Sequence, residues 1–177
     1  MRLNMNNIYL VGFMGTGKTA TGKFLAEEKH IIYIDLDERI EKKEGMSISE
    51  IFSNKGEKYF RLLEKEALKD VSNHKNAVVS CGGGIVIDPG NIDIMGKTGT
   101  IFCLTATADV ILQRTSRFTH RPLLNVANPK EKIESLLKER SPFYALADKT
   151  IDTSQLSVAD TANKIMEYLK THGAGPK

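Results

Sequence analysis

The eight residues from Gly12 to Thr19 constrain this chain more than any other stretch. They read Gly-Phe-Met-Gly-Thr-Gly-Lys-Thr and fit the phosphate-binding pattern G-x-x-x-x-G-K-[ST], with an additional glycine at Gly15. Residues 8–11, which come before the pattern, form an apolar run suited to a buried strand, and residues 18–29 after it can form a helix. Strand, loop and helix therefore follow one another in the order that a phosphate-binding loop requires.

The residue types in this loop suit a nucleoside triphosphate. Glycines allow backbone N–H groups to turn toward phosphates, and the N-terminus of the following helix adds a partial positive charge. Lys18 is expected to reach the β- and γ-phosphates, and the hydroxyl of Thr19 is expected to bind Mg2+. The predicted nucleotide-binding residues of the loop are Gly12, Gly15, Thr16, Gly17, Lys18 and Thr19.

Length and composition predict one domain. With 177 residues, 41% of them hydrophobic, the chain can bury one core, and we expect a single domain over residues 1–172 with a disordered end at 173–177. The net charge of +3 is spread without a long run of one sign, so no nucleic-acid partner is predicted. Cys81 and Cys103 are expected to be buried thiols. The apolar run Ile8 to Met14 is too short for a membrane span and lacks a cleavage site, which predicts a cytoplasmic protein without a membrane partner.

Two acids follow the second apolar run. Residues 30–37 end in Asp35 and Asp37, whose spacing would place both carboxylates on one side of a strand end. Ligands of open parallel sheets bind outside the carboxyl ends of the strands, so both acids are candidates for the chemistry. The plainer interpretation is that Asp37 caps a helix over residues 38–43, and the two roles are compatible.

A helix that begins near Ser47 carries an arginine of interest. Ser47 and Glu50 have capping-box spacing, and after a break at Gly56 the sequence again has helical periodicity. Arg61 lies beside the apolar stripe of this helix, three residues before Glu64. The local pattern alone favours a surface ion pair between them.

Alternating strand and helix patterns continue to the end of the chain. Three glycines, Gly82 to Gly84, follow the strand predicted over residues 77–81, and they either allow a ligand to approach the backbone or supply a loop that needs positive φ. Residues 115–124 form a polar loop between two helices, and Pro142 is predicted to break the second helix, with Ser141 as the next N-cap. This alternation predicts a doubly wound, mostly parallel five-stranded sheet with helices on both faces.

Four motifs together resemble the shikimate kinase family, over the range from about Ile8 to Leu169. They are Gly12 to Thr19, Asp35-Leu36-Asp37, Phe60-Arg61-Leu62-Leu63-Glu64 and Gly82-Gly83-Gly84, and Arg121-Pro122-Leu123-Leu124 and Arg140 with Tyr144 add weaker matches. The resemblance implies an α/β P-loop kinase fold, with a five-stranded parallel sheet, helices on both faces and a mobile lid at about 115–124. It also implies transfer of the γ-phosphoryl group of ATP to the 3-hydroxyl of shikimate, in the pathway to chorismate and the aromatic amino acids.

The resemblance implies a role for each site residue. Arg61 and Arg140 would bind the carboxylate of shikimate, because a planar guanidinium suits an anion with two oxygens. Asp37 would accept or orient the proton of the attacking hydroxyl, with the N–H groups of Gly82, Gly83 and Gly84 nearby.

The nucleotide side follows from the same resemblance. Asp35 would hold Mg2+ through water, and Thr19 would coordinate the ion directly. Lys18 and Arg121 would neutralise charge on the transferring phosphoryl group, and the lid would bring Arg121 in. Arg114 would stack on adenine, with Thr153 near the other face of the base.

Two positions depart from the family's pattern. Ala145 stands where an arginine often follows the tyrosine, and residues 153–155, Thr-Ser-Gln, replace a usual basic residue near adenine. His120, in the predicted lid, is expected to be a solvent-exposed histidine. We expect the protein to act as a monomer on two small-molecule substrates, ATP and shikimate.

Two alternatives were weighed. A P-loop kinase of the gluconate kinase or nucleoside monophosphate kinase type shares the loop, but its acceptor does not explain Asp37, Arg61 and the three glycines together. A GTP-driven switch would need Asn-Lys-x-Asp after the fourth strand, and residues 104–109 contain no such run.

Overall fold

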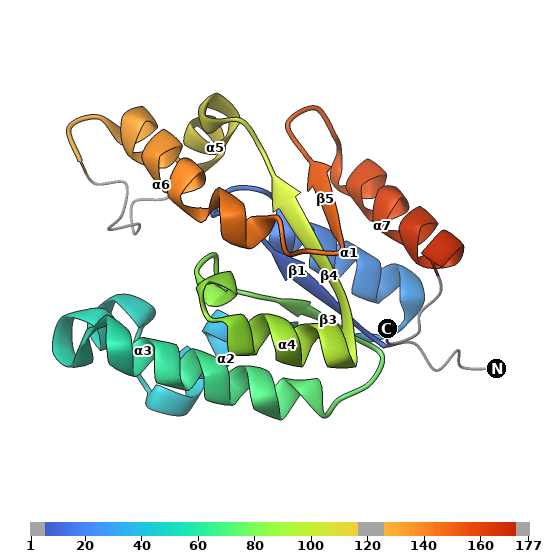
Figure 1. Ribbon diagram of the computed structural model, residues 1–177, viewed down its shortest axis with the longest axis horizontal. Helices are drawn as coiled ribbons and strands as arrows, with labels where there is room; N and C mark the ends of the chain where they lie inside the picture. The colour runs from blue at the N-terminus through green and yellow to red at the C-terminus, as the bar shows by residue number, and fades with distance from the viewer. Residues whose placement is uncertain (1–5, 117–125, 173–177) are drawn as a thin grey trace.

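The structure is a computed structural model that describes residues 6–116 and 126–172. Its centre is a five-stranded sheet with the order β2-β3-β1-β4-β5, in which every neighbouring pair is parallel (Figure 1). The strands are β1 (Asn7–Val11), β2 (Ile32–Asp35), β3 (Ala77–Ser80), β4 (Gly99–Thr105) and β5 (Lys149–Asp152). The predicted parallel sheet is confirmed.

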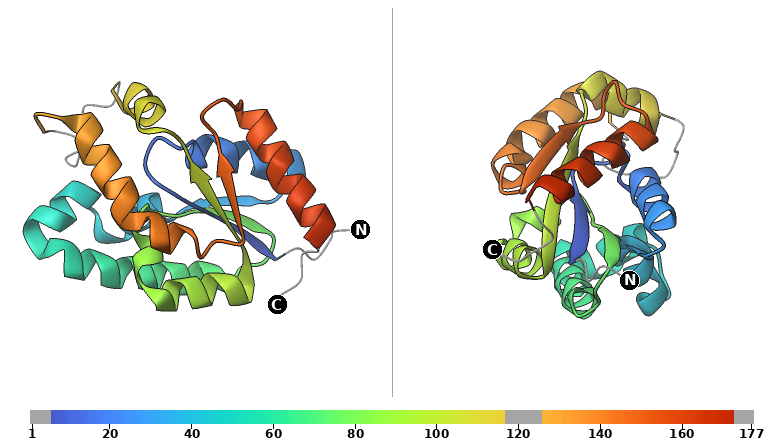
Figure 2. Two further views of the ribbon diagram at one scale, coloured as in Figure 1. Left: turned by 45° about the horizontal axis from the view of Figure 1, so that its top comes forward. Right: turned by 90° about the vertical axis from the view of Figure 1, so that its right-hand side faces the viewer.

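Helices cover both faces of this sheet, as Figures 1 and 2 show. They are α1 (Lys18–Lys29), α2 (Leu36–Glu44), α3 (Ile48–Ser72), α4 (Pro89–Thr98), α5 (Ala108–Thr115), α6 (Pro129–Tyr144), α7 (Val158–His172) and the short 3-10 helix η1 (Ile85–Ile87). Among the described residues, no helix is long and apolar enough to cross a membrane.

Alternate residues of β1 face two separate cores. Ile8 and Leu10 join a cluster with α1 and α7, whereas Tyr9 and Val11 join a cluster with α2, α3 and α4. Successive side chains of a strand point to opposite faces, and a parallel strand covered on both faces is apolar throughout. The continuous apolar run before the phosphate-binding pattern thus identifies a central strand.

The helix start predicted at Ser47 and the break predicted at Gly56 are confirmed. Ser47 and Glu50 form a reciprocal capping box, and Gly56, with φ 80°, kinks α3 where a break was expected. Thr107 caps α5 by accepting a hydrogen bond from the N–H of Val110. The hydroxyl of Ser157 accepts from the N–H of Asp160 at the start of α7.

The break predicted at Pro142 is wrong, because α6 runs through it to Tyr144. Proline removes its own hydrogen bond to the carbonyl four residues back, but the bond from the N–H of Ala145 to the carbonyl oxygen of Ser141 still forms and closes the last turn. The buried side chain of Tyr144, two residues after the proline, packs in the core and holds this last turn in place. Arg140 therefore projects from a continuous helix.

The carboxyl ends of the strands bring distant segments together. In the sheet register, Ser80 of β3 pairs with both Leu10 of β1 and Asp35 of β2. The phosphate-binding loop, the two acids and the three glycines therefore leave neighbouring strands at one edge. The predicted lid at about 115–124 and the predicted disordered end at 173–177 lie mostly or wholly outside the described residues.

Candidate active site

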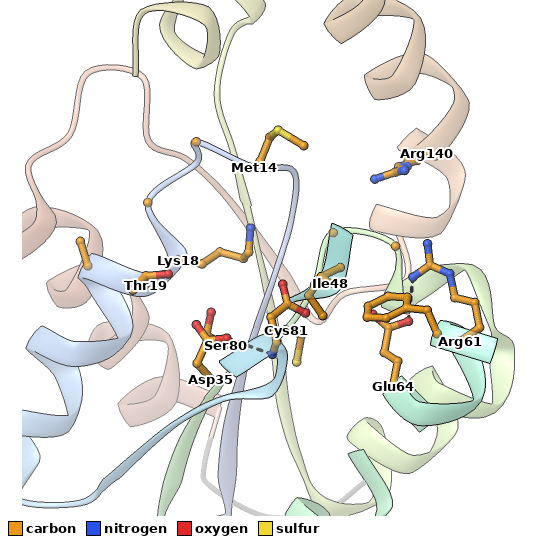
Figure 3. Close-up of a pocket in the computed structure, with 18 of the residues that line it drawn as sticks. Met14, Lys18, Thr19, Asp35, Ile48, Arg61, Glu64, Ser80, Cys81 and Arg140 are labelled. Atoms are coloured by element: carbon orange, nitrogen blue, oxygen red, sulfur yellow. Dashed lines mark hydrogen bonds and ion pairs between the residues drawn. The ribbon is translucent and has the colours of Figure 1, made fainter. Parts of the chain in front are cut away.

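A pocket of about 650 Å³ opens at this edge of the sheet. In Figure 3, Lys18, Thr19 and Asp35 lie on one side of it, and Arg61, Glu64 and Arg140 lie on the other. The first group comes from the start of α1 and the end of β2, whereas the second projects from α3 and α6. The pocket thus joins a phosphate-binding side to a side with two guanidinium groups.

Three glycines give the phosphate-binding loop its shape. Gly12, Gly15 and Gly17 all have positive φ, at 131°, 76° and 95°. A Cβ atom on Gly12 would also collide with the carbonyl oxygen of Leu104 in β4. The loop needs glycine at Gly12 both for its backbone angle and for its close approach to the neighbouring strand.

Lys18 lies across the loop from the first turn of α1. Its Nζ donates hydrogen bonds to the carbonyl oxygens of Gly12 at 2.8 Å and Phe13 at 2.9 Å. The buried hydroxyl of Thr16 also donates to Phe13 at 2.8 Å. No side chain caps the N-terminus of α1. Uncapped N–H groups and a lysine at a helix N-terminus are the chemistry that binds phosphate.

Asp35 is fixed in place by three donors. Its Oδ1 accepts from the N–H groups of Asp37 at 3.0 Å and Glu38 at 3.3 Å, so Asp35 is the N-cap of α2. The hydroxyl of Tyr33 donates to Oδ2 at 3.1 Å. The prediction that Asp37 caps this helix is therefore wrong. Since β2 ends at Asp35, whose backbone is still extended, Asp35 is the residue before the first helical turn.

Asp37 lies in the first turn of α2 and lines the same pocket. Its Oδ1 is buried and has no hydrogen-bond partner among the described residues. Burial, together with the like charge of Asp35, raises the pKa of Asp37 to about 6. A buried carboxyl with an unpartnered oxygen and a pKa near neutrality is suited to accept a proton.

The guanidinium of Arg61 is held between two carboxylates of its own helix. Nη1 donates to Glu64 at 2.8 Å, and Nη2 donates to the exposed Glu57 at 2.9 Å. The predicted pair with Glu64 is present, but it is no surface pair, because Glu64 is fully buried. Burial raises the pKa of Glu64 to about 7, and the charge of Arg61 opposes this rise.

The three glycines bring the backbone up against these side chains. A Cβ atom on Gly82 would lie 2.9 Å from Oε1 of Glu64 and 3.1 Å from Oδ1 of Asp37. A Cβ atom on Gly84 would collide with the guanidinium of Arg61. Gly84 has φ −97°, so there it is the close approach, and not positive φ, that requires glycine.

Arg140 reaches the pocket from α6. Its guanidinium lies 5.7 Å from the ring centroid of Phe13, and its Nε is buried without a hydrogen-bond partner among the described residues. An unpartnered donor on a buried cation is costly unless a ligand completes its hydrogen bonding. Together with Arg61, this residue gives the pocket a site for an anion.

Arg114 and Thr153 link the loop to β5. Arg114 donates to Gly15 O at 3.2 Å, to Thr153 Oγ1 at 3.0 Å and to Thr153 O at 2.8 Å. The side chain of Thr153 is buried, and its hydroxyl also lies 2.9 Å from Thr16 O. Arg114 lines the pocket, whereas Thr153 stands behind it and holds Arg114 and the loop.

The oxygen atoms beside Lys18 suit Mg2+. Thr19 supplies a hydroxyl and Asp35 a carboxylate, and both line the pocket next to the loop. Within residues 6–116 and 126–172, no group of three or more His, Cys, Asp or Glu side chains could hold a metal by itself. Mg2+ is usually bound by one or two protein ligands together with phosphates and water, so this donor set fits that ion.

Known proteins match both the sequence and the fold. The family model described as shikimate kinase matches residues 14–170. The shikimate kinase of Caldanaerobacter subterraneus is 47% identical over 170 residues, which cover 96% of this chain and 99% of the relative. That of Thermodesulfovibrio yellowstonii is 47% identical over 163 residues, covering 92% and 94%. The chain belongs to the shikimate kinase family.

Solved structures of shikimate kinases share the fold. The shikimate kinase of Acinetobacter baumannii, solved in complex with shikimate, superposes with a TM-score of 0.90 at 39% identity and covers 96% of this chain. That of Aquifex aeolicus gives a TM-score of 0.79 at 35% identity and also covers 96%. These comparisons confirm the P-loop kinase fold and the family resemblance seen in the sequence.

Most of the residues proposed for this family's site lie together. Those that line the pocket are Gly15, Gly17, Lys18, Thr19, Asp35, Asp37, Arg61, Gly82, Gly83, Gly84, Arg114 and Arg140. Gly12 and Thr16 shape the loop from behind. Arg121 lies outside the described residues, so its role stays a prediction.

The sequence analysis gives Glu64 as an ion-pair partner and as the last residue of a family motif, and Tyr144 as part of a weaker match, and it assigns neither a role in the site. Glu64 follows Phe60 by four residues and precedes Leu68 by four, so it lies on the buried face of α3. A charged residue on an apolar stripe is the signal that identifies it as a site candidate. The hydroxyl of Tyr144 contacts Gly83, which no local pattern reveals.

Proposed function

We propose that the chain transfers the γ-phosphoryl group of ATP to the 3-hydroxyl of shikimate, a step toward chorismate and the aromatic amino acids. The observation that carries this proposal is the position of Asp37. Its unpartnered oxygen lies in one pocket with a phosphate-binding loop and with two arginines. Family membership and the shikimate complex of the Acinetobacter baumannii relative support the choice of acceptor.

The donor side is proposed to bind Mg2+ and the phosphates of ATP. Thr19 and Asp35 would hold the ion, which would neutralise charge on the β- and γ-phosphates. Lys18 would exchange its hydrogen bonds to Gly12 and Phe13 for phosphate oxygens, and Arg121 would add a second cation. Arg114, held at the loop, would contact the base.

The acceptor side is proposed to hold shikimate by its carboxylate. Arg61 and Arg140 would bind that group, and the buried, unpartnered Nε of Arg140 supports this role. The N–H groups of Gly82 to Gly84 would contact the ring hydroxyls. Asp37 would then accept the proton of the attacking hydroxyl as the bond to phosphorus forms.

The geometry argues against the two alternatives. A gluconate or nucleotide acceptor leaves the two converging guanidinium groups and the close approach of the glycines to Arg61 unexplained. A nucleotide-driven switch has no use for an unpartnered acid next to the phosphate loop. A monomeric state, a single domain and a cytoplasmic location stay predictions from the sequence.

One coupled assay tests the proposal. ADP release from ATP and Mg2+ is measured with shikimate, gluconate, AMP or no acceptor, and only shikimate should stimulate it. If gluconate or AMP stimulated ADP release, or if shikimate did not raise it above the rate without acceptor, the proposed function would be contradicted.

A substitution tests the role of Asp37. Asp37→Asn should lower turnover by about 100-fold or more, because it removes the proton acceptor, and should leave ATP affinity largely unchanged. Asp93→Asn, which removes an equal charge from an exposed pair with Lys97, is the matched control. Wild-type turnover in Asp37→Asn would exclude Asp37 from the mechanism.

A further inference from the structure

The last turn of α6 contacts the glycine segment through a tyrosine. The hydroxyl of Tyr144 donates a hydrogen bond to the carbonyl oxygen of Gly83 at 2.8 Å, across 61 positions of sequence. The ring is buried in the core cluster that includes Cys81 and Ile85, on either side of the glycines. A buried phenol normally finds a partner for its hydroxyl, and here that partner is a backbone atom of the pocket wall.

Gly83 lies where three parts of the site meet. A Cβ atom on it would stand 3.2 Å from the carbonyl oxygen of Gly12, 3.4 Å from Nη1 of Arg140 and 3.4 Å from the hydroxyl of Tyr144. The phosphate-binding loop, the arginine of α6 and the phenol thus surround one residue. The position of its peptide therefore matters for the groups that line this part of the pocket.

Arg140 lies close to the phenol, since its Nη1 and the hydroxyl of Tyr144 are both 3.4 Å from the position of a Cβ atom on Gly83. The charge of Arg140 lowers the pKa of Tyr144, but burial outweighs it and raises that pKa to about 12. The phenol therefore stays protonated near neutral pH and keeps its hydrogen bond to Gly83.

The orientation of the Gly83 peptide decides where the next N–H points. No cis peptide bond occurs among the described residues, so the C=O of Gly83 and the N–H of Gly84 point in opposite directions. The N–H of Gly84 has no hydrogen-bond partner in the described part of the chain. Holding the Gly83 oxygen toward α6 keeps this N–H directed away from α6.

We propose that Tyr144 is a positioning residue for acceptor binding, and this inference rests on the proposed function. Its hydroxyl holds the Gly83–Gly84 peptide and the guanidinium of Arg140 in one fixed arrangement. It touches neither substrate, and it acts through the N–H of Gly84 and through Arg140. Loss of the hydroxyl should weaken shikimate binding and leave the nucleotide side unchanged.

The test compares two tyrosine-to-phenylalanine variants. Tyr144→Phe keeps the buried ring and removes only the hydroxyl. Tyr9→Phe is the matched control, because its fully buried hydroxyl is 2.7 Å from Thr98, just before β4 begins, far from the carboxyl edge. Thermal unfolding of both variants measures what each hydroxyl contributes to the fold.

Shikimate binding and steady-state kinetics supply the readout. For Tyr144→Phe we expect the shikimate Kd, measured by calorimetry, and the KM to rise about tenfold, as for one lost hydrogen bond. Turnover should fall less than about threefold, since Asp37 is untouched, and ADP affinity should not change. Tyr9→Phe should leave Kd, KM and turnover at their wild-type values.

The possible failures can be told apart. If wild-type protein does not bind shikimate, the proposed function itself fails. If wild type binds but Tyr144→Phe binds equally well, only the positioning role is overturned. If Tyr144 had a purely structural role, Tyr144→Phe would have a lower melting temperature without a selective rise in the shikimate KM. That result would also overturn the positioning role.

Discussion

Glu64 should make the stability of the folded chain depend on pH, and Glu64→Gln is the change that isolates this effect. The carboxyl is fully buried, and one of its oxygens, Oε1, has no hydrogen-bond partner among the described residues. The charged groups that face it are Arg61 of α3, Asp37 of α2 and Arg140 of α6. Burial outweighs the two arginines and raises its pKa from 4.5 to about 7.

The sign and size of the effect follow from this difference. A carboxyl whose pKa is higher in the folded state stabilises the fold below its unfolded pKa, and that stability is lost as pH rises through the folded pKa. A change from 4.5 to about 7 corresponds to about 3 kcal/mol at most. Most of this, roughly 2.5 kcal/mol, should be lost between about pH 5 and pH 8.

Urea unfolding at these two pH values measures the effect. The free energy of unfolding of wild type minus that of Glu64→Gln should fall by about 2 to 3 kcal/mol from pH 5 to pH 8. Asp37 also titrates in this range, but it is present in both proteins, so the subtraction largely removes its contribution. Glu66→Gln lies on the same helix as Glu64 and removes a charge from an exposed pair with Lys43 of α2, so it should show no such change.

A constant difference between wild type and Glu64→Gln would refute this reasoning. It would mean that Arg61 keeps the Glu64 carboxylate ionised from pH 5 to pH 8 and that burial destabilises the ionised form little. A difference that grows with pH would show that the ion pair, rather than burial, dominates the energetics of Glu64.

Three glycine and arginine substitutions test other parts of the site. Arg61→Ala should weaken shikimate binding by about 2 kcal/mol or more in calorimetry, and an unchanged affinity would return Arg61 to a purely structural ion pair. Gly84→Ala should displace the guanidinium of Arg61 without straining the backbone, so the KM for shikimate should rise while that for ATP stays the same; equal effects on both would contradict this. Gly12→Ala should lower the free energy of unfolding in urea by more than about 2 kcal/mol, because it combines positive φ with a collision at Leu104. Gly45→Ala, which has positive φ in open space, should cost only about 1 kcal/mol, and similar losses in both variants would discount the collision.

Local sequence signals predicted the elements of the fold well. The phosphate-binding loop, the capping residue Ser47 and the strand predicted over residues 77–81 lie where short patterns placed them, with the strand ending at Ser80. Each depends on residues within a few positions of one another. Such signals do not specify which strands become neighbours, so the strand order came from the structure.

The errors have local physical causes. Asp35 and not Asp37 caps α2, because the strand gives way to helix without an intervening turn. Pro142 remains in α6, because it lies in the last turn of that helix. Both predictions identified the right kind of residue effect but misplaced it along the chain.

Contacts between distant residues were beyond prediction from one sequence. The bond from Tyr144 to Gly83 and the contact of Arg114 with Thr153 join segments far apart in the chain. The hydroxyl of Thr153 contacts Arg114 and the backbone of Thr16, and the expected place of Thr153 near adenine stays a prediction. Side chains that hold other side chains leave no periodic pattern, so they become visible only when the chain is folded.

The strand order has a consequence for how this site could diverge. The phosphate-binding loop follows the central strand, whereas Asp37, Arg61 and the glycines all come from the stretch between β2 and η1, on one side of it. Apart from Arg140, the residues proposed to bind the acceptor thus form one continuous block of sequence. An exchange of that block between relatives would change which hydroxyl compound is accepted and would leave the phosphate-binding loop unchanged. Natural selection can therefore change the acceptor and the donor sites largely independently.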